Sequence, residues 1–250
     1  ETRQDLAAIA EDWGAVGITI NNDSGVKQMT ELVRLTAMLS SSTRGLSTGD
    51  AVEKLGKFAA IYYPDVADFV GEAEKLFSVI SKLEDVTPLD AGDILATAQR
   101  MASVTKALDI APEKALALAA AVASVNASAE RAGTQMATAL NTMVVKTDKV
   151  AALFGTTEEN VKSLMAGHPE DFFLTIASSI AAIEDPLERV RETQAVFGTT
   201  GGKALGGLSG SIENVARIMA VANDEFVKGT YLQFQFDAAL ESTKNQLSIL

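Results

Sequence analysis

The sequence predicts an all-α protein, a multi-helix array of packed helical hairpins with no significant sheet. Apolar residues recur at intervals of three and four along most of the chain, which is the period of one helix face. Aromatic residues make up only 6% of the chain while hydrophobic residues make up 47%, so Ala, Leu, Val and Met must fill the core. Small side chains of this kind favour close packing between helices. From a mean helix length near twelve residues, we expect about eight to eleven helices.

The net charge and the absence of cysteine disfavour some classes of function. The 250 residues carry a net charge of −12. An acidic chain is a poor candidate for tight nucleic-acid binding, because duplex binding depends on Lys and Arg that neutralise phosphates. With no cysteine in the sequence, neither disulfides nor thiolate chemistry is available. The longest apolar runs, residues 115–123 and 176–183, are too short to span a bilayer, so we expect no membrane segment and no signal peptide.

The stretch from Ala111 to Gly155 is expected to be the centre of the fold. Residues 115–123 are almost entirely Ala, Leu and Val, which predicts a helix that is buried on most sides. Ser128 can cap the next helix, and the small Gly133 lets a neighbouring backbone approach closely. Apolar spacing then predicts one long helix that Gly155 ends in a left-handed conformation.

The spacing of apolar residues at intervals of three and four also predicts helices outside this central stretch. Trp13, the only tryptophan, is interpreted as a packing anchor, and Ser47 or Thr48 as the cap of the third helix. Residues 21–25 are expected to be a loop, because they are rich in residues that bond their own backbone, and residues 40–45 are expected to be a polar break between helices. The predicted helices cover residues 5–20, 26–39, 51–62, 66–83, 94–108, 157–167, 172–183, 187–197 and 211–226. Residues 232–236 alternate like a strand, but helical sequence flanks them and we predict helix there as well.

Five prolines, each followed within a few residues by an acid, predict five helix starts. Proline fits the first helical turn because its φ is fixed and its missing N–H had no intrahelical partner. An acid in that turn interacts favourably with the helix dipole. The predicted starts are Pro64, Pro88, Pro112, Pro169 and Pro186.

No arrangement of residues predicts a catalytic, cofactor or metal site. His168 is the only histidine and lies in a predicted turn, so it cannot build a zinc site alone. The segment from Gly198 to Ala204 resembles a phosphate-binding loop, but its spacing is one residue short and Ala204 replaces the required hydroxyl. We interpret it as a glycine-rich hinge between helices. The acid pairs Glu158–Glu159 and Glu184–Asp185 are interpreted as helix caps.

We divide the chain into an N-terminal helical segment, residues 1–86, and a helical core, residues 87–250. Leu32 to Ser42 resembles Leu118 to Ser128 and suggests that the N-terminal segment is repeat-related. Helices made of small residues match one another easily, so an array without a repeat remains the alternative.

The order of the central motifs resembles the core region of phage tail tape measure proteins. The Ala-rich helix is followed by SAERAGT at Ser128–Thr134 and by ALNTM at Ala139–Met143. The sequence VFGTTGGKALGGL at Val196–Leu208 is similar to the family's phenylalanine–glycine turn and the leucine-bearing helix after it. Asp93–Ile110 resembles the family's preceding helix, so the resemblance covers roughly residues 87–226.

This resemblance implies a structural protein of a phage or prophage tail and no enzyme. In that family the protein lies inside the growing tail tube and sets the tail length. The implied partners are the tail tube protein, tail assembly chaperones and distal tail proteins, and homo-oligomerisation is left open. The implied location is the virion tail, with the host cytoplasm during assembly. Two alternatives stay open: a helical-repeat adaptor that binds other proteins, and a cell-wall-degrading module of a tail protein.

Overall fold

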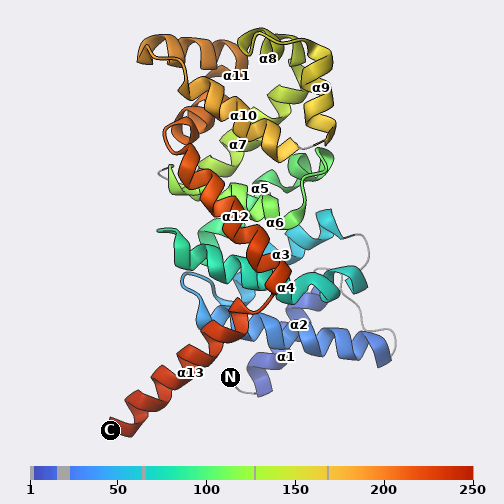
Figure 1. Cartoon of the computed structure of the whole chain (residues 1–250). Helices are drawn as coiled ribbons and strands as arrows, with labels where there is room; N and C mark the ends of the chain where they lie inside the picture. Colours follow the sequence, from blue (N-terminus) through green and yellow to red (C-terminus); the bar gives the residue numbers. More distant parts are fainter. Residues whose placement is uncertain (1–2, 16–22, 64–65, 127, 168, 250) are drawn as a thin grey trace. The chain divides into compact units, whose positions relative to one another are not determined.

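The structure, a computed structural model, describes residues 3–15, 23–63, 66–126, 128–167 and 169–249 (Figure 1). This part of the chain forms thirteen helices and no strand, which confirms the all-α prediction. The contacts divide the chain into two units. Unit 1 consists of residues 1–95 and 221–250, and unit 2 consists of residues 96–220. The sequence-based boundary after residue 86 therefore differs from these units, because the C-terminal residues pack with the N-terminal ones.

Unit 1 contains four N-terminal helices and the last helix of the chain. Their bounds are α1 Arg3–Ala15, α2 Asp23–Ser42, α3 Thr48–Tyr62, α4 Val66–Val86 and α13 Tyr231–Ile249. Helix α2 is central, since it contacts α1, α3, α4 and α13. The fully buried Trp13 of α1 donates a hydrogen bond from Nε1 to Oγ1 of Thr36 on α2 at 3.1 Å. The prediction that Trp13 is a packing anchor is thus confirmed.

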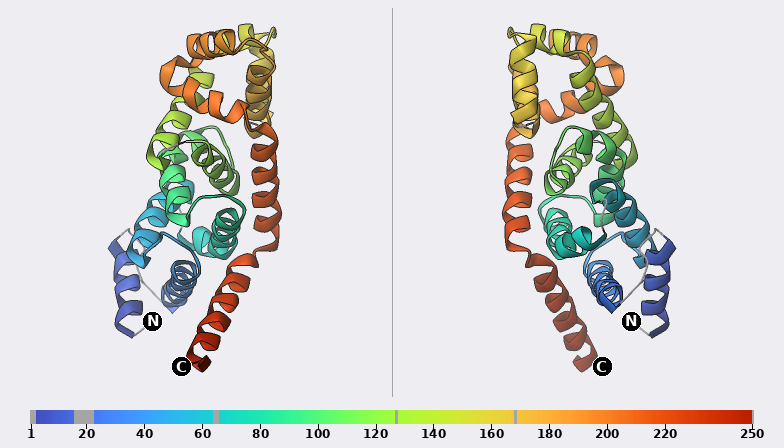
Figure 2. Two further views of the ribbon diagram at one scale, coloured as in Figure 1. Left: turned by 90° about the vertical axis from the view of Figure 1, so that its left-hand side faces the viewer. Right: turned by 90° about the vertical axis from the view of Figure 1, so that its right-hand side faces the viewer.

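The corner before α13 is fixed by a buried carboxylate. Gly229 adopts a left-handed φ of 62° and ends α12 (Ile212–Lys228), which bends the chain there (Figure 2). Glu225, only 5% exposed, accepts hydrogen bonds from the backbone N–H groups of Thr230 and Tyr231 at 2.9 and 2.8 Å. These N–H groups have no partner inside α13, so the carboxylate caps that helix. Helix α13 then packs on α2 and α4.

Unit 2 is built around the predicted central hairpin. Its helices are α6 Pro112–Ser124, α7 Ala129–Val145, α8 Thr147–Leu153, α9 Glu158–Gly167, α10 Pro169–Ala181 and α11 Pro186–Ser209, while α5 (Ala91–Ala107) and α12 each lie partly in both units. Helix α6 is buried from Ala115 through Ala123, as its composition predicts. Helix α7 packs extensively on α11, and Gly201 of α11 approaches so closely that a Cβ there would lie 3.1 Å from Cα of Ala139.

Several predicted helix ends agree with the structure. Pro112, Pro169 and Pro186 each begin a helix, and Ser47 and Ser128 accept the expected capping bonds from Asp50 and Arg131. Gly155 has the left-handed φ of 61°. Residues 232–236 are helical within α13. Pro64 lies outside the described residues, and so does the part of the first predicted helix beyond Ala15.

Other predicted boundaries are wrong. The long helix over residues 129–154 breaks into α7 and α8 at Lys146, whose backbone is non-helical and whose Nζ donates to the carbonyl of Val196. This break adds one helix, and the thirteen helices of the described residues exceed the expected eight to eleven. Pro88 does not begin a helix: α5 begins three residues later, where the Asp90 side chain accepts a hydrogen bond from the N–H of Asp93 at 2.8 Å.

The two predicted N-terminal interruptions are wrong over most of their described residues. Residues 21 and 22 lie outside the described residues, and α2 already begins at Asp23. It continues through Ser42, so only residues 43–45 of the predicted polar break are non-helical. The hydroxyls of Ser41 and Ser42 bond to the carbonyls of Ala37 and Met38, one turn earlier, at 2.6 and 2.7 Å. These local bonds let serines extend the helix that their usual preference for turns would end. No helix found here is both long and apolar enough to cross a membrane.

Candidate interaction site

In the part of the chain that the structure describes, the acidic residues considered for catalysis lie at or beside helix N-termini. His168 lies outside these residues. In the described ranges no group of three or more His, Cys, Asp or Glu side chains could hold a metal ion. Glu158 and Glu159 lie in the first turn of α9, and the Asp185 side chain accepts the N–H of Leu187 at the start of α11. Three of the four paired acids therefore act at helix N-termini, while Glu184 is exposed before α11.

The glycine-rich segment forms a break within a helix. Gly198 has φ 69° and ψ 176°, a conformation inside α11 that essentially only glycine adopts. The helix resumes after it, and Gly201 packs against α7. The predicted separation of two helices by a glycine conformation is thus present as a kink. The exposed Lys203 and the buried Thr193 line a small pocket of about 290 Å³ beside it.

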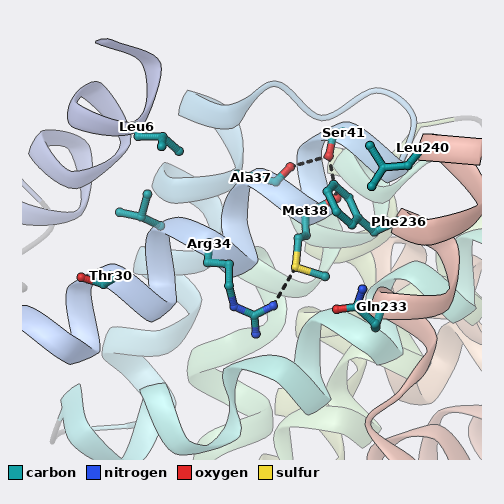
Figure 3. Close-up of a pocket in the computed structure, with 10 residues that line it drawn as sticks. Leu6, Thr30, Arg34, Ala37, Met38, Ser41, Gln233, Phe236 and Leu240 are labelled. Carbon is teal, nitrogen blue, oxygen red and sulfur yellow. Dashed lines mark hydrogen bonds between the residues drawn. The ribbon is translucent and has the colours of Figure 1, made fainter. Parts of the chain in front are cut away.

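Unit 1 contains a larger groove between α2 and α13, with one residue from α1 (Figure 3). Its volume is about 690 Å³. Ten residues line it: Leu6, Thr30, Val33, Arg34, Ala37, Met38, Ser41, Gln233, Phe236 and Leu240. Leu6 and Leu240 remain 38% and 43% exposed, so apolar surface faces the opening. A cavity of this size is within the range that binds organic ligands or side chains of a partner.

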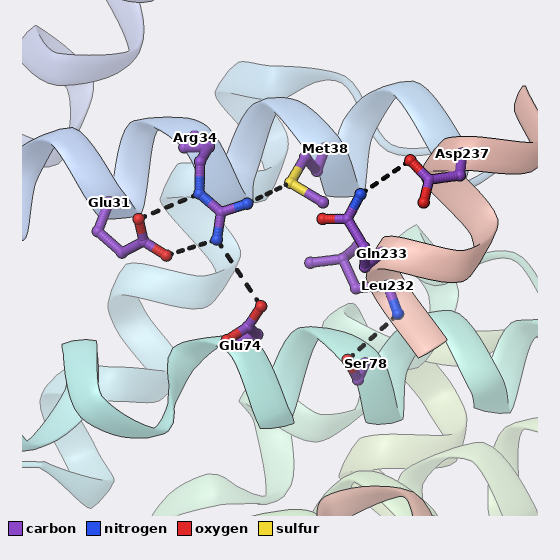
Figure 4. A network of polar contacts seen from close by, with 8 residues as sticks. All are labelled: Glu31, Arg34, Met38, Glu74, Ser78, Leu232, Gln233 and Asp237. Carbon is purple, nitrogen blue, oxygen red and sulfur yellow. Dashed lines mark hydrogen bonds and ion pairs between the residues drawn. The ribbon is translucent and has the colours of Figure 1, made fainter. Parts of the chain in front are cut away.

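A polar network fixes the one charged side chain in this groove (Figure 4). Arg34 donates to both carboxylate oxygens of Glu31 at 3.1 and 2.6 Å, lies 3.7 Å from Glu74, and contacts Sδ of Met38 at 3.0 Å. The hydrogen bond from Arg34 lowers the pKa of Glu31, and the same bond raises the pKa of Arg34. Arg34 therefore stays charged, with its charge offset by two carboxylates.

Sequence reasoning missed this groove, although one signal was present. The six α2 residues that line it stand at positions 30, 33, 34, 37, 38 and 41, which together form one complete helix face. Three of them, Thr30, Ala37 and Ser41, are small. The α13 side could not be assigned, because nothing in the sequence links residues about two hundred positions apart.

Comparison with known proteins supplies the family. Residues 1–198 match the family described as phage-related minor tail protein. No curated protein and no solved structure matches the chain. The match covers well over half of the 250 residues and includes helices of both units. The chain therefore belongs to the family of phage-related minor tail proteins, with a structural role in the phage tail.

Proposed function

We propose that this tail protein is a segment of a tape measure protein, which occupies the tail tube and sets the tail length during assembly. The observation that carries the proposal is the order of three motifs within a phage-related minor tail protein: Ser128–Thr134, Ala139–Met143 and Val196–Leu208. This order resembles the core of tape measure proteins. Membership in the family of phage-related minor tail proteins is compatible with this role.

The composition of the chain supports a structural role. A ruler acts through its length and needs no reactive group, and the described residues contain no cluster of metal ligands. The net charge of −12 would weaken any hold on DNA that passes through the tube. The proposed partners are the tail tube protein, the tail assembly chaperones and the distal tail proteins. The proposed location is the virion tail, after assembly in the host cytoplasm.

The adaptor function is the second candidate, because the groove between α2 and α13 offers apolar surface to a partner. An adaptor would depend on the side chains of that groove, whereas a ruler would depend on the number of residues. A cell-wall-degrading module is less favoured, since it needs a catalytic acid in a cleft. The acid pairs considered for that role lie at or beside helix N-termini instead.

Tail length in the parent phage tests the proposal. An in-frame deletion of α9 and α10 removes a helical hairpin that has its own mutual contacts. The ruler role predicts virions with shorter tails, measured by electron microscopy. The matched control is Lys203→Ala, which alters an exposed side chain and should leave tail length unchanged. Infectious particles with tails of normal length after the deletion would exclude the ruler role for this segment.

A further inference from the structure

The acidic charge of this protein is concentrated in one unit. Within the sequence ranges of unit 1, twenty acidic residues face ten basic ones, a net charge of −10. Unit 2 has thirteen acidic and eleven basic residues, a net charge of −2. Unit 1 therefore carries almost all of the net charge, and it also contains the apolar groove.

The groove has the shape of a helix-binding site. On α2 the lining residues run from Thr30 to Ser41, which is about three helical turns or roughly 17 Å. Small residues on this face leave space, while the α13 residues Phe236 and Leu240 provide larger apolar surface; Met38 also lines the groove but is only 4% exposed. The α13 residues follow the helical spacing as well, at positions 233, 236 and 240. Two helix faces that meet in this way present a channel for the apolar ridge of a third helix.

The charges beside the groove are mostly negative. Asp237 and Glu241 are exposed on α13 next to Phe236 and Leu240. On the other side, Glu31 and Glu74 more than balance Arg34. The basic Lys27 and Lys244 lie one helical turn beyond the lining residues of α2 and α13, respectively. The middle of the groove thus combines apolar side chains and the paired Arg34 with the acidic side chains of Glu31, Glu74, Asp237 and Glu241 beside them.

We propose that this groove docks an amphipathic helix of a partner protein, about three turns long, whose apolar ridge is flanked by Lys or Arg. The apolar ridge would fill the space over Ala37 and Ser41, and the basic residues would lie near Asp237 and Glu241. The proposal goes beyond the ruler role, since docking is measured on the purified chain without reference to tail length.

The charge distribution also disfavours a second copy of this chain as the occupant. Two units with a net charge of −10 each would repel one another, and like charges brought together at an interface oppose association. Complementary charge on the partner would instead speed association and select the correct helix. The proposal therefore predicts that the purified chain forms no dimer through the groove, which sedimentation velocity of wild type and Ala37→Phe at micromolar concentration tests.

Two designed peptides test the proposal by fluorescence anisotropy with the full chain. Both are helical peptides of about fifteen residues with Leu at i, i+3, i+4 and i+7. One carries Lys at the flanking positions and the other carries Glu there. We expect the Lys peptide to bind and the Glu peptide to bind at least about tenfold more weakly, with the difference shrinking at high salt.

Matched variants locate the binding. Ala37→Phe fills the groove and should weaken binding of the Lys peptide by at least about tenfold. Its control is Ala152→Phe, the same change at an exposed position of α8.

Reversing the charge beside the groove tests the second part of the proposal. Asp237→Lys with Glu241→Lys should weaken binding of the Lys peptide and strengthen binding of the Glu peptide. The control for this reversal is Glu188→Lys with Glu192→Lys on α11, at the same spacing of four residues. Circular dichroism verifies that each variant folds, and Ser41→Phe replaces Ala37→Phe if that variant is unfolded.

The results of these experiments distinguish a basic partner helix from the other possible occupants of the groove. Binding of the Lys peptide that is lost only in the groove variants supports the proposal. Absence of peptide binding, equal binding of both peptides, or binding that Ala37→Phe and Ser41→Phe leave unchanged overturns it. A dimer of the chain that dissociates in the Ala37→Phe variant also overturns it, since a second copy would then fill the groove. A groove that takes only a small apolar dye and no helix overturns it too.

Discussion

A Cβ atom on Gly133 would lie 2.7 Å from the carbonyl oxygen of Thr97. It would also lie 2.9 Å from Cβ of Arg100, so α7 and α5 meet within unit 2 with no room for a methyl group. The hydroxyl of Thr97 donates to the carbonyl of Ala129 at 3.0 Å, which ties the same two segments together. The prediction from sequence that Gly133 permits a close backbone approach is confirmed.

Replacing Gly133 should therefore destabilise the protein, although alanine is the better helix former. Overpacking in Gly133→Ala should cost about 1–3 kcal/mol, and Gly133→Leu should cost more. Gly206 on α11 is the matched control, since no atom lies within 4 Å of a Cβ placed there. Gly206→Ala should stabilise by up to about 1 kcal/mol. Thermal unfolding should thus show melting temperatures shifted in opposite directions, and a raised value for Gly133→Ala would contradict the packed hairpin.

The kink at Gly198 gives a second prediction. Its φ of 69° and ψ of 176° fall in a region that is nearly closed to residues with a side chain, although a Cβ there would meet no atom within 4 Å. The penalty is thus conformational, and both Gly198→Ala and Gly198→Asn should lose about 1–3 kcal/mol. Asn should not rescue the site, because it tolerates the left-handed helical region and not this one. Denaturant unfolding measures both variants, and a neutral Gly198→Asn would show that the kink is not required.

The hydrogen bond between Trp13 and Thr36 gives a third prediction, on stability. Both side chains are completely buried, so removing the acceptor leaves an indole N–H without a partner. Thr36→Val should cost about 1–3 kcal/mol in the free energy of unfolding. In Trp13→Phe, which has no N–H, the same change should cost less. A double-mutant cycle measures this coupling, and additive losses would show that the bond contributes nothing.

The pair of Glu31 and Arg34 predicts a small dependence of stability on pH. The hydrogen bond from Arg34 lowers the pKa of Glu31 below its ordinary value of 4.5. A folded-state pKa below the unfolded one means that stability is gained above the unfolded pKa and lost as pH falls through the folded pKa. Both side chains are more than 40% exposed, so the effect should be at most about 1 kcal/mol. Chemical unfolding of wild type and Glu31→Gln measures it.

The difference in the free energy of unfolding between wild type and Glu31→Gln should be present at neutral pH and should vanish in acid. Glu31→Gln removes the charge of Glu31 alone, so the comparison reports on this carboxylate and its pairing with Arg34. A difference that stays constant from neutral to acid pH would assign the effect of the substitution to packing or helix propensity and not to the charged pair.

The sequence predicts helix starts well where one residue decides the local geometry. Pro112, Pro169 and Pro186 begin helices, and Ser128 caps one, because each acts on backbone groups within a single turn. The break at Lys146 could not be predicted in this way. Lys146 is an ordinary helix residue, and its Nζ bonds to the carbonyl of Val196, fifty positions away. Tertiary contacts thus override the local preference there.

The same reasoning explains why the groove could not be predicted. The small-residue face of α2 is visible in the sequence, but a groove needs a second wall. That wall is α13, which is anchored by a hydrogen bond from the N–H of Leu232 to Oγ of Ser78 at 3.2 Å and by the cap from Glu225. The contact of Leu232 with Ser78 joins residues 154 positions apart, so no short-range pattern in the sequence predicts it.

Tail length measured against the number of residues tests the ruler role most directly. A series of phages would carry in-frame deletions and duplications of whole hairpins of this chain, and electron microscopy would measure their tails. If the segment is extended helix within the tube, length should change by about 1.5 Å per residue, so about forty residues correspond to roughly 60 Å. If the segment stays folded in the tube, tail length should still increase with the number of residues, but by less per residue. Infectious particles whose tail length is the same across the series would contradict the ruler role.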